Sequence, residues 1–98
     1  MSGDKLIHRM TLANKMPADA SDPLLVEVRD VIHQRLGLEL DQVRARAAFV
    51  ELGADSLDVV DIMLTLEKRL QITFQSSDFR SIDRVSDLVA VIRAKLAA

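Results

Sequence analysis

The sequence predicts an all-α domain, a small four-helix bundle with three longer helices, one short helix and a long first loop. Three segments carry apolar residues at the i, i+3, i+4, i+7 spacing of a helix with one buried face. No stretch of useful length shows the alternation of apolar and polar residues that is typical of a strand. With 98 residues, the chain has room for one hydrophobic core and for no second domain.

The first helix is predicted over residues 23–36. Asp22 offers a side-chain acceptor at the N-cap, Pro23 suits the first helical position, and Gly37 suits the C-cap. The predicted buried stripe is Leu24, Leu25, Val28, Val31, Ile32 and Leu36. Residues 1–22 form an N-terminal extension without a long stripe. In it a short amphipathic helix at residues 6–12 stays undecided, because so short a helix is marginal without a surface to pack on.

A long loop precedes the second helix, which is predicted over residues 56–70. The loop has irregularly spaced apolar anchors: Leu38, Leu40, Val43, Phe49 and Leu52. The helix has an apolar pattern of Leu57, Val60, Met63, Leu64, Leu66 and Leu70. Val59 and Ile62 widen this pattern beyond one face, so we expect part of it to be exposed for a partner.

Two more helices are predicted near the C-terminal end. A Ser-Ser-Asp cluster predicts a short helix near residues 77–82, which places Phe79 and Ile82 against the core. The last helix is predicted over residues 85–97, with a stripe of Val85, Leu88, Val89, Ile92 and Leu96. Asp87 near its start and Lys95 near its end match the helix dipole.

The composition excludes several classes of function. A formal net charge of -2 gives no general basic field for a nucleic-acid backbone. The absence of cysteine excludes disulfides, zinc–thiolate sites and a cysteine nucleophile. The sequence has no long apolar run and no apolar segment of the kind that precedes a signal cleavage site. We therefore expect a soluble, cytoplasmic protein.

Chemistry is concentrated around Ser56. A glycine-containing turn brings its hydroxyl to the start of a helix, where free N–H groups favour a phosphate. Five acids and no Lys or Arg lie within residues 51–67, namely Glu51, Asp55, Asp58, Asp61 and Glu67. They predict a negative surface, on which Asp58 and Asp61 can face a basic partner or share a divalent cation. The plainer interpretation is an ordinary helix N-cap, with acids that interact favourably with the positive end of the helix dipole.

The stretch from Phe49 to Leu57 resembles the acyl carrier protein family, in which F-x-x-L-G-x-D-S-L marks the start of the second helix. All six fixed positions are present: Phe49, Leu52, Gly53, Asp55, Ser56 and Leu57. The resemblance extends from about Pro23 to Leu96 and implies an acyl carrier domain over residues 23–98. It also implies a four-helix bundle and a carrier function, with no catalytic residues supplied by this chain.

The resemblance implies that Ser56 carries 4′-phosphopantetheine, which a phosphopantetheinyl transferase moves from coenzyme A with Mg²⁺. The thiol that holds acyl groups is then part of this arm. Asp55 helps the transferase to engage the site, and partner enzymes bind a recognition face formed by Leu57, Asp58, Val60, Asp61 and Leu64. Beyond the transferase, the implied partners are acyl-loading, acyl-transfer or condensing enzymes of lipid or secondary-metabolite biosynthesis, and the chain is expected to be a monomer with no resident metal. The cargo is not determined.

Two departures suggest a specialised carrier. Lys68 and Arg69 stand where many fatty-acid carriers have acids, so the partner surface is expected to be of mixed sign, as also at Arg80 and Arg84. The extension with its basic Lys5, Arg9 and Lys15 has no assigned role. An acyl chain has a conceivable berth among nine apolar residues that are otherwise ordinary core: Val28, Ile32, Phe49, Ile62, Met63, Leu66, Ile82, Val89 and Ile92.

Other functions fit the residues less well. A serine hydrolase of the Gly-Asp-Ser-Leu type is disfavoured because Ala54 interrupts the block and because His8 lies in the extension. His33, on the first helix, is interpreted as a side chain at the edge of the solvent. A divalent-cation sensor built on Asp55, Asp58 and Asp61 lacks EF-hand spacing. The main alternative is an unmodified, carrier-like interaction module.

Overall fold

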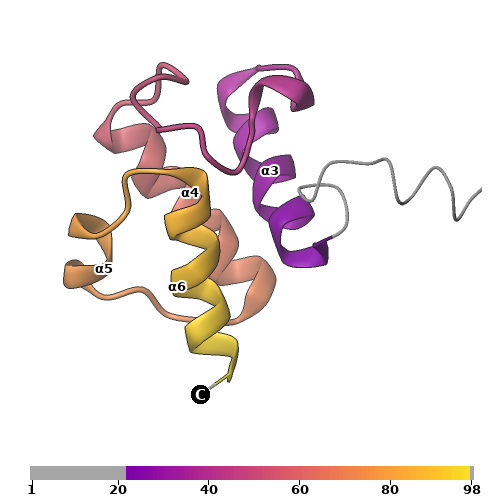
Figure 1. Ribbon diagram of the computed structural model, residues 1–98. Coiled ribbons are helices and arrows are strands. Elements are labelled where there is room, and N and C mark those ends of the chain that lie inside the picture. Colours follow the sequence, from indigo (N-terminus) through magenta and orange to yellow (C-terminus); the bar gives the residue numbers. More distant parts are fainter. Residues whose placement is uncertain (1–21, 98) are drawn as a thin grey trace, which may run out of the picture.

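The computed structural model describes residues 22–97, so the extension and its undecided helix lie outside the described part of the chain. It contains helices α3 (Pro23–Leu36), α4 (Ser56–Leu70), α5 (Ser76–Arg80) and α6 (Val85–Ala97), and a 3-10 turn η1 (Leu40–Gln42). Figure 1 shows the three long helices packed together, with α5 to one side and the long loop crossing from α3 to α4. This arrangement confirms the predicted all-α bundle with three longer helices, one short helix and a long first loop.

The predicted caps set both ends of α3. Oδ1 of Asp22 accepts a hydrogen bond from the N–H of Leu24 at 3.1 Å. Gly37 has a φ of 68°, and its N–H donates to the carbonyl of His33 at 2.9 Å. Because glycine adopts this left-handed conformation without a Cβ penalty, the helix ends at Leu36 as predicted.

The core lies between α3, α4 and α6, and α3 packs against both of the other helices. Most of the predicted stripes are buried, but Leu40 is 45% and Leu96 51% exposed, so these two predicted core positions were wrong. Phe74, which the sequence analysis did not single out, is buried at 8% exposure. The core residues are Leu25, Val28, Val31, Ile32, Val43, Phe49, Ile62, Met63, Leu66, Phe74, Ile82, Val85, Leu88, Val89 and Ile92.

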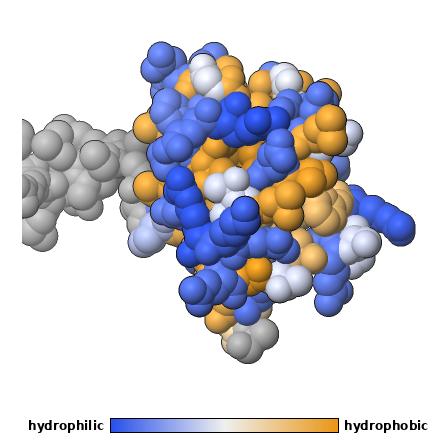
Figure 2. Space-filling model, turned by 180° about the vertical axis from the view of Figure 1, so that it is seen from behind, coloured by the Kyte–Doolittle hydropathy of each residue, from blue (hydrophilic) through white to orange (hydrophobic). Residues whose placement is uncertain are grey.

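Helix α4 has the excess apolar surface that was predicted, and it includes two residues of the predicted recognition face, Leu57 and Leu64. Ile62 is fully buried and Val59 packs against the core, whereas Leu57 is 72% and Leu64 45% exposed. Residues 57, 60 and 64 follow one helical stripe, and residues 59, 62, 63 and 66 follow another. Packing against α3 buries the second stripe and leaves much of the first at the surface. In Figure 2, hydrophobic side chains reach the surface between hydrophilic ones.

Backbone bonds to the start of α6 hold the long loop in place. The N–H of Phe49 donates to Asp83 O at 2.9 Å, and the N–H of Val85 donates to Ala47 O at 3.0 Å. Within residues 22–97, an isolated antiparallel β-bridge joins Ala48 and Arg84. The loop therefore ends in a fixed position beside α6, just before α4 begins.

Helix α5 spans Ser76–Arg80, while the sequence predicted residues 77–82. It begins earlier because Gln75 and Asp78 form a capping box, in which the N–H of Gln75 donates to Oδ2 of Asp78 at 2.7 Å. The short helix still places Ile82 in the core and Phe79 against it, as predicted. None of the helices within residues 22–97 has both the length and the apolar character that a membrane crossing requires.

Candidate cofactor attachment site

A tight turn delivers Ser56 to the start of α4. The carbonyl of the buried Phe49 accepts hydrogen bonds from the N–H groups of Leu52 at 3.1 Å and Ala54 at 3.0 Å. Gly53 has a φ of 80°, a conformation that side chains with a Cβ rarely adopt. The residues of the motif thus act as one unit: Phe49 anchors the turn in the core, and Gly53 allows its path.

Asp55 and Asp58 cap α4 reciprocally. The N–H of Asp58 donates to Oδ1 of Asp55 at 2.9 Å, and the N–H of Asp55 donates to Oδ2 of Asp58 at 3.1 Å. Ser56 is therefore the first residue of the helix, not its cap, and its side chain is exposed. Within residues 22–97, no side-chain hydrogen bond engages the Ser56 hydroxyl. A phosphate attached there would meet the positive end of the α4 dipole.

A mainly apolar cavity of about 380 Å³ opens directly beside Ser56. Its lining comes from the start of α4 and from the α5 region: Ala54, Asp55, Ser56, Val59, Val60, Phe79 and Ile82. Of the nine residues considered as a berth for an acyl chain, Ile82 alone lines this cavity, and all nine are buried core residues. The structure therefore supports the interpretation of these nine residues as ordinary core.

The residues of the predicted recognition face lie along one side of α4. Leu57 and Leu64 are exposed, Val60 is half-buried, and Asp61 is exposed. The negative charge of this face is reduced by a residue that the sequence analysis missed. The guanidinium of Arg35, on α3, contacts Oδ1 of Asp58 at 3.1 Å and Oδ2 of Asp61 at 2.7 Å. The predicted negative surface was inferred from residues 51–67 alone, and Arg35 of α3 adds a positive charge beside it.

Arg69 makes the reciprocal contact from α4 to α3. Its Nη1 lies 3.0 Å from Glu27 and 3.3 Å from Asp30, and the hydrogen bonds to these carboxylates raise the pKa of Arg69. The charge of Arg69 is therefore directed at α3, and the mixed sign of the partner surface stays a prediction. A sequence signal existed: each of the two helices carries an acid pair three residues apart and an arginine near its C-terminal end.

The alternative sites find little support in the geometry. Among the side chains of residues 22–97, no group of three or more His, Asp or Glu residues is arranged to hold a metal ion. The cation sensor would need Asp58 and Asp61, which Arg35 already contacts. The imidazole Nδ1 of His33 is hydrogen-bonded to the carbonyl of Leu38, so His33 stabilises the chain reversal after α3. His8 lies outside the described residues.

The fold is thus a helical bundle in which an exposed serine begins the second long helix. The family model described as "Phosphopantetheine attachment site" matches residues 26–92. An acyl carrier protein of Exiguobacterium is 34% identical over 76 residues, which is 76% of this chain and 96% of the relative. An acyl carrier protein of Akkermansia muciniphila is 40% identical over 67 residues, or 67% of this chain and 84% of the relative.

The structural comparison agrees with these sequence matches. The crystal structure of the acyl carrier protein from Thermotoga maritima has a TM-score of 0.68 and 27% identity, and the match covers 76% of this chain and 87% of that one. The chain belongs to the acyl carrier protein family. It is a carrier of acyl groups, and its cofactor is covalently attached 4′-phosphopantetheine.

Proposed function

We propose that Ser56 is the residue to which 4′-phosphopantetheine is attached. The observation that carries this proposal is the position of its exposed hydroxyl, at the first turn of α4 and beside an apolar cavity. The N–H groups of the first turn stabilise a phosphodiester, and the cavity receives the apolar part of what is attached. When bound, the arm supplies the thiol that holds an acyl group as a thioester.

The partner surface is proposed to be the face formed by Leu57, Asp58, Val60, Asp61 and Leu64, with Asp55 beside the modified serine. Its support is the exposure of Leu57 and Leu64, since exposed apolar side chains among acids are typical of a protein-binding surface. A phosphopantetheinyl transferase and enzymes that load, transfer or condense acyl groups would bind here. Weak and exchangeable complexes suit such a carrier.

The remaining parts of the proposal concern the chain as a whole. We assign the carrier domain to residues 23–98 and the extension to residues 1–22, because the family match at residues 26–92 lies inside the first range. The chain supplies no catalytic residue, acts as a monomer in the cytoplasm, and serves a specialised pathway of lipid or secondary-metabolite biosynthesis. A general carrier would instead accept malonyl groups and support bulk elongation of fatty acids.

The attachment is tested by intact mass before and after incubation with coenzyme A, Mg²⁺ and a broad-specificity phosphopantetheinyl transferase. Wild type and Ser76→Ala are expected to gain one phosphopantetheinyl group, and Ser56→Ala to gain none. Ser76 is a matched control because it is also the first residue of a capped helix. A wild-type chain that stays unmodified while a control carrier is converted would support the alternative of an unmodified interaction module.

A further inference from the structure

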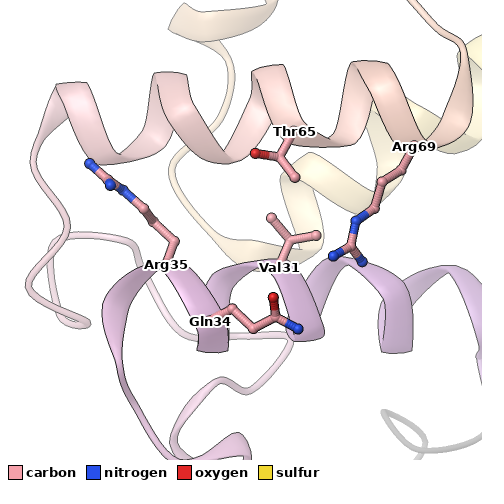
Figure 3. Close-up of a pocket in the computed structure, with 5 residues that line it drawn as sticks. All are labelled: Val31, Gln34, Arg35, Thr65 and Arg69. Carbon is pink, nitrogen blue, oxygen red and sulfur yellow. The ribbon is translucent and has the colours of Figure 1, made fainter.

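Two arginine contacts join α3 and α4, one at each end of the helix pair. Arg35, near the C-terminal end of α3, contacts Asp58 and Asp61 in the first half of α4. Arg69, near the C-terminal end of α4, contacts Glu27 and Asp30 around the middle of α3. In Figure 3 the two guanidinium groups point from opposite helices into the space between them. The hollow that they border has a volume of about 310 Å³ and is also lined by Val31, Gln34 and Thr65.

Both contacts are arginine–carboxylate ion pairs, and they differ in which carboxylates the arginine contacts. Each arginine side chain is partly exposed, at 43% for Arg35 and 36% for Arg69, and each contacts two carboxylates three residues apart. The carboxylates held by Arg69 belong to α3, away from the modified serine in sequence and at the other end of the helix pair. The carboxylates held by Arg35 belong to the proposed recognition face, two and five residues after Ser56.

Arg35 occupies carboxylate oxygens that a cationic partner would need. Oδ2 of Asp58 already accepts the N–H of Asp55, and Oδ1 contacts Arg35, so both oxygens of Asp58 have partners. Oδ2 of Asp61 also contacts Arg35. A partner that brings an arginine or lysine to these acids meets a like charge and must displace it. Since an exposed ion pair contributes little to stability, the displacement is reversible.

We propose that Arg35 is an internal competitor that sets the partner specificity of the recognition face. It weakens binding by proteins whose contact with Asp58 and Asp61 is a cationic side chain. It leaves binding through the apolar Leu57 and Leu64 unaffected, and so favours partners of that kind. This inference rests on the proposed function, because it takes the α4 face to be the surface that partners bind.

The first test measures kcat/KM for phosphopantetheinylation of Arg35→Gln, Arg35→Lys and Arg69→Gln. Arg35→Gln is expected to lower KM about two- to five-fold without changing kcat, the factor that corresponds to an exposed ion pair. Arg35→Lys keeps the positive charge and should stay near wild type. Arg69→Gln changes the net charge equally and also breaks an α3–α4 contact. It should leave KM unchanged, because the carboxylates that it frees belong to α3 and not to the recognition face. Equal KM values for all four proteins would overturn the inference.

A double-mutant cycle isolates the mechanism. If Arg35 acts by covering the two carboxylates, Arg35→Gln should have no further effect on KM in a protein that carries Asp58→Asn and Asp61→Asn. An undiminished effect in that background would refute the masking. All proteins in this cycle retain Ser56, so any effect on the modification step itself is shared by the KM values that are compared, and it cancels.

A second readout does not depend on modification. A tetra-arginine peptide titrated onto ¹⁵N-labelled protein is expected to bind Arg35→Gln about two- to five-fold more tightly than wild type, with shifts at the amides of residues 58 and 61. For Arg69→Gln any new shifts should fall on residues 27 and 30 instead. Tighter peptide binding in a protein that is never modified would refute the attachment and support the masking. Modification at Ser56 with unchanged KM and unchanged peptide binding would refute the masking alone.

Discussion

Asp55 is expected to have two separable roles, one in the stability of α4 and one in modification of the adjacent serine. Its Oδ1 accepts the N–H of Asp58 at 2.9 Å, and its carboxylate charge lies beside Ser56 at the helix N-terminus. Asparagine keeps an oxygen in the capping position and removes the charge, whereas alanine removes both. The pair of variants Asp55→Asn and Asp55→Ala therefore distinguishes the hydrogen bond from the charge.

The magnitudes follow from the cap geometry. Loss of an N-cap acceptor costs about 1 kcal/mol, which in a domain of this size lowers Tm by about 4–8 °C. Asp55→Asn loses only the interaction of the charge with the helix dipole, about 0.3 kcal/mol and screened by salt, so Tm should fall by about 1–2 °C. Both variants should reduce kcat/KM for phosphopantetheinylation alike, by about fivefold, because both remove the carboxylate.

Thermal unfolding followed by circular dichroism and initial rates of modification provide the two measurements. Two results would refute the reasoning. Equal loss of Tm in both variants would mean that the oxygen at residue 55 does not cap α4. A wild-type modification rate in Asp55→Asn would mean that the charge has no part in engaging the transferase.

Three further predictions concern the turn, the core and an acidic contact. Gly53→Ala should lower the free energy of unfolding, measured by urea titration, by about 1 kcal/mol, because a φ of 80° is strained for alanine. The added Cβ itself meets no atom within 4 Å, so no steric clash adds to this cost. Ile62→Ala should cost about 2–5 kcal/mol and Leu64→Ala less than about 0.5 kcal/mol, because Ile62 is fully buried and Leu64 is 45% exposed; a reversed order would contradict the assignment of the two stripes. The N–H of Gln75 and the ammonium of Lys95 lower the pKa of Asp78 below 3.8. The ionised Asp78 carboxylate therefore stabilises the fold above pH 3.8. In urea titrations, Asp78→Asn should have a lower free energy of unfolding than wild type near neutral pH. This difference in free energy should disappear as the pH falls below 3.8.

Local signals were sufficient to predict the long helices. The Asp22–Pro23 start, the Gly37 stop and the Gly-Ala-Asp-Ser turn are chemical features of short segments, and the structure places the ends of α3 and α4 at the predicted residues. The motif also indicated the position of Ser56, because helix N-termini are determined by neighbouring residues.

Contacts between distant segments could not be predicted in the same way. The choice between the two apolar stripes of α4 depends on where α3 packs, so helical periodicity alone could not distinguish the buried Ile62 from the exposed Leu57. The pairing of Arg35 with Asp58 spans 23 residues of sequence and requires the relative direction of two helices. Phe74 joins the core from the segment after α4, where its N–H donates to Oε2 of Glu67 at 2.7 Å and the Lys95 ammonium lies 5.7 Å from its ring centre. No local pattern carries that information.

Attachment of the arm to Ser56 is tested most directly by peptide mapping of the modified protein. Trypsin cuts after Arg46 and Lys68, and the resulting peptide, residues 47–68, contains Ser56 as its single serine. The other serines after residue 46, at 76, 77, 81 and 86, lie in different tryptic peptides. We expect the phosphopantetheinyl group on peptide 47–68, with fragment ions that place it on Ser56 and not on Thr65. A group found on any other peptide, or on Thr65, would contradict it.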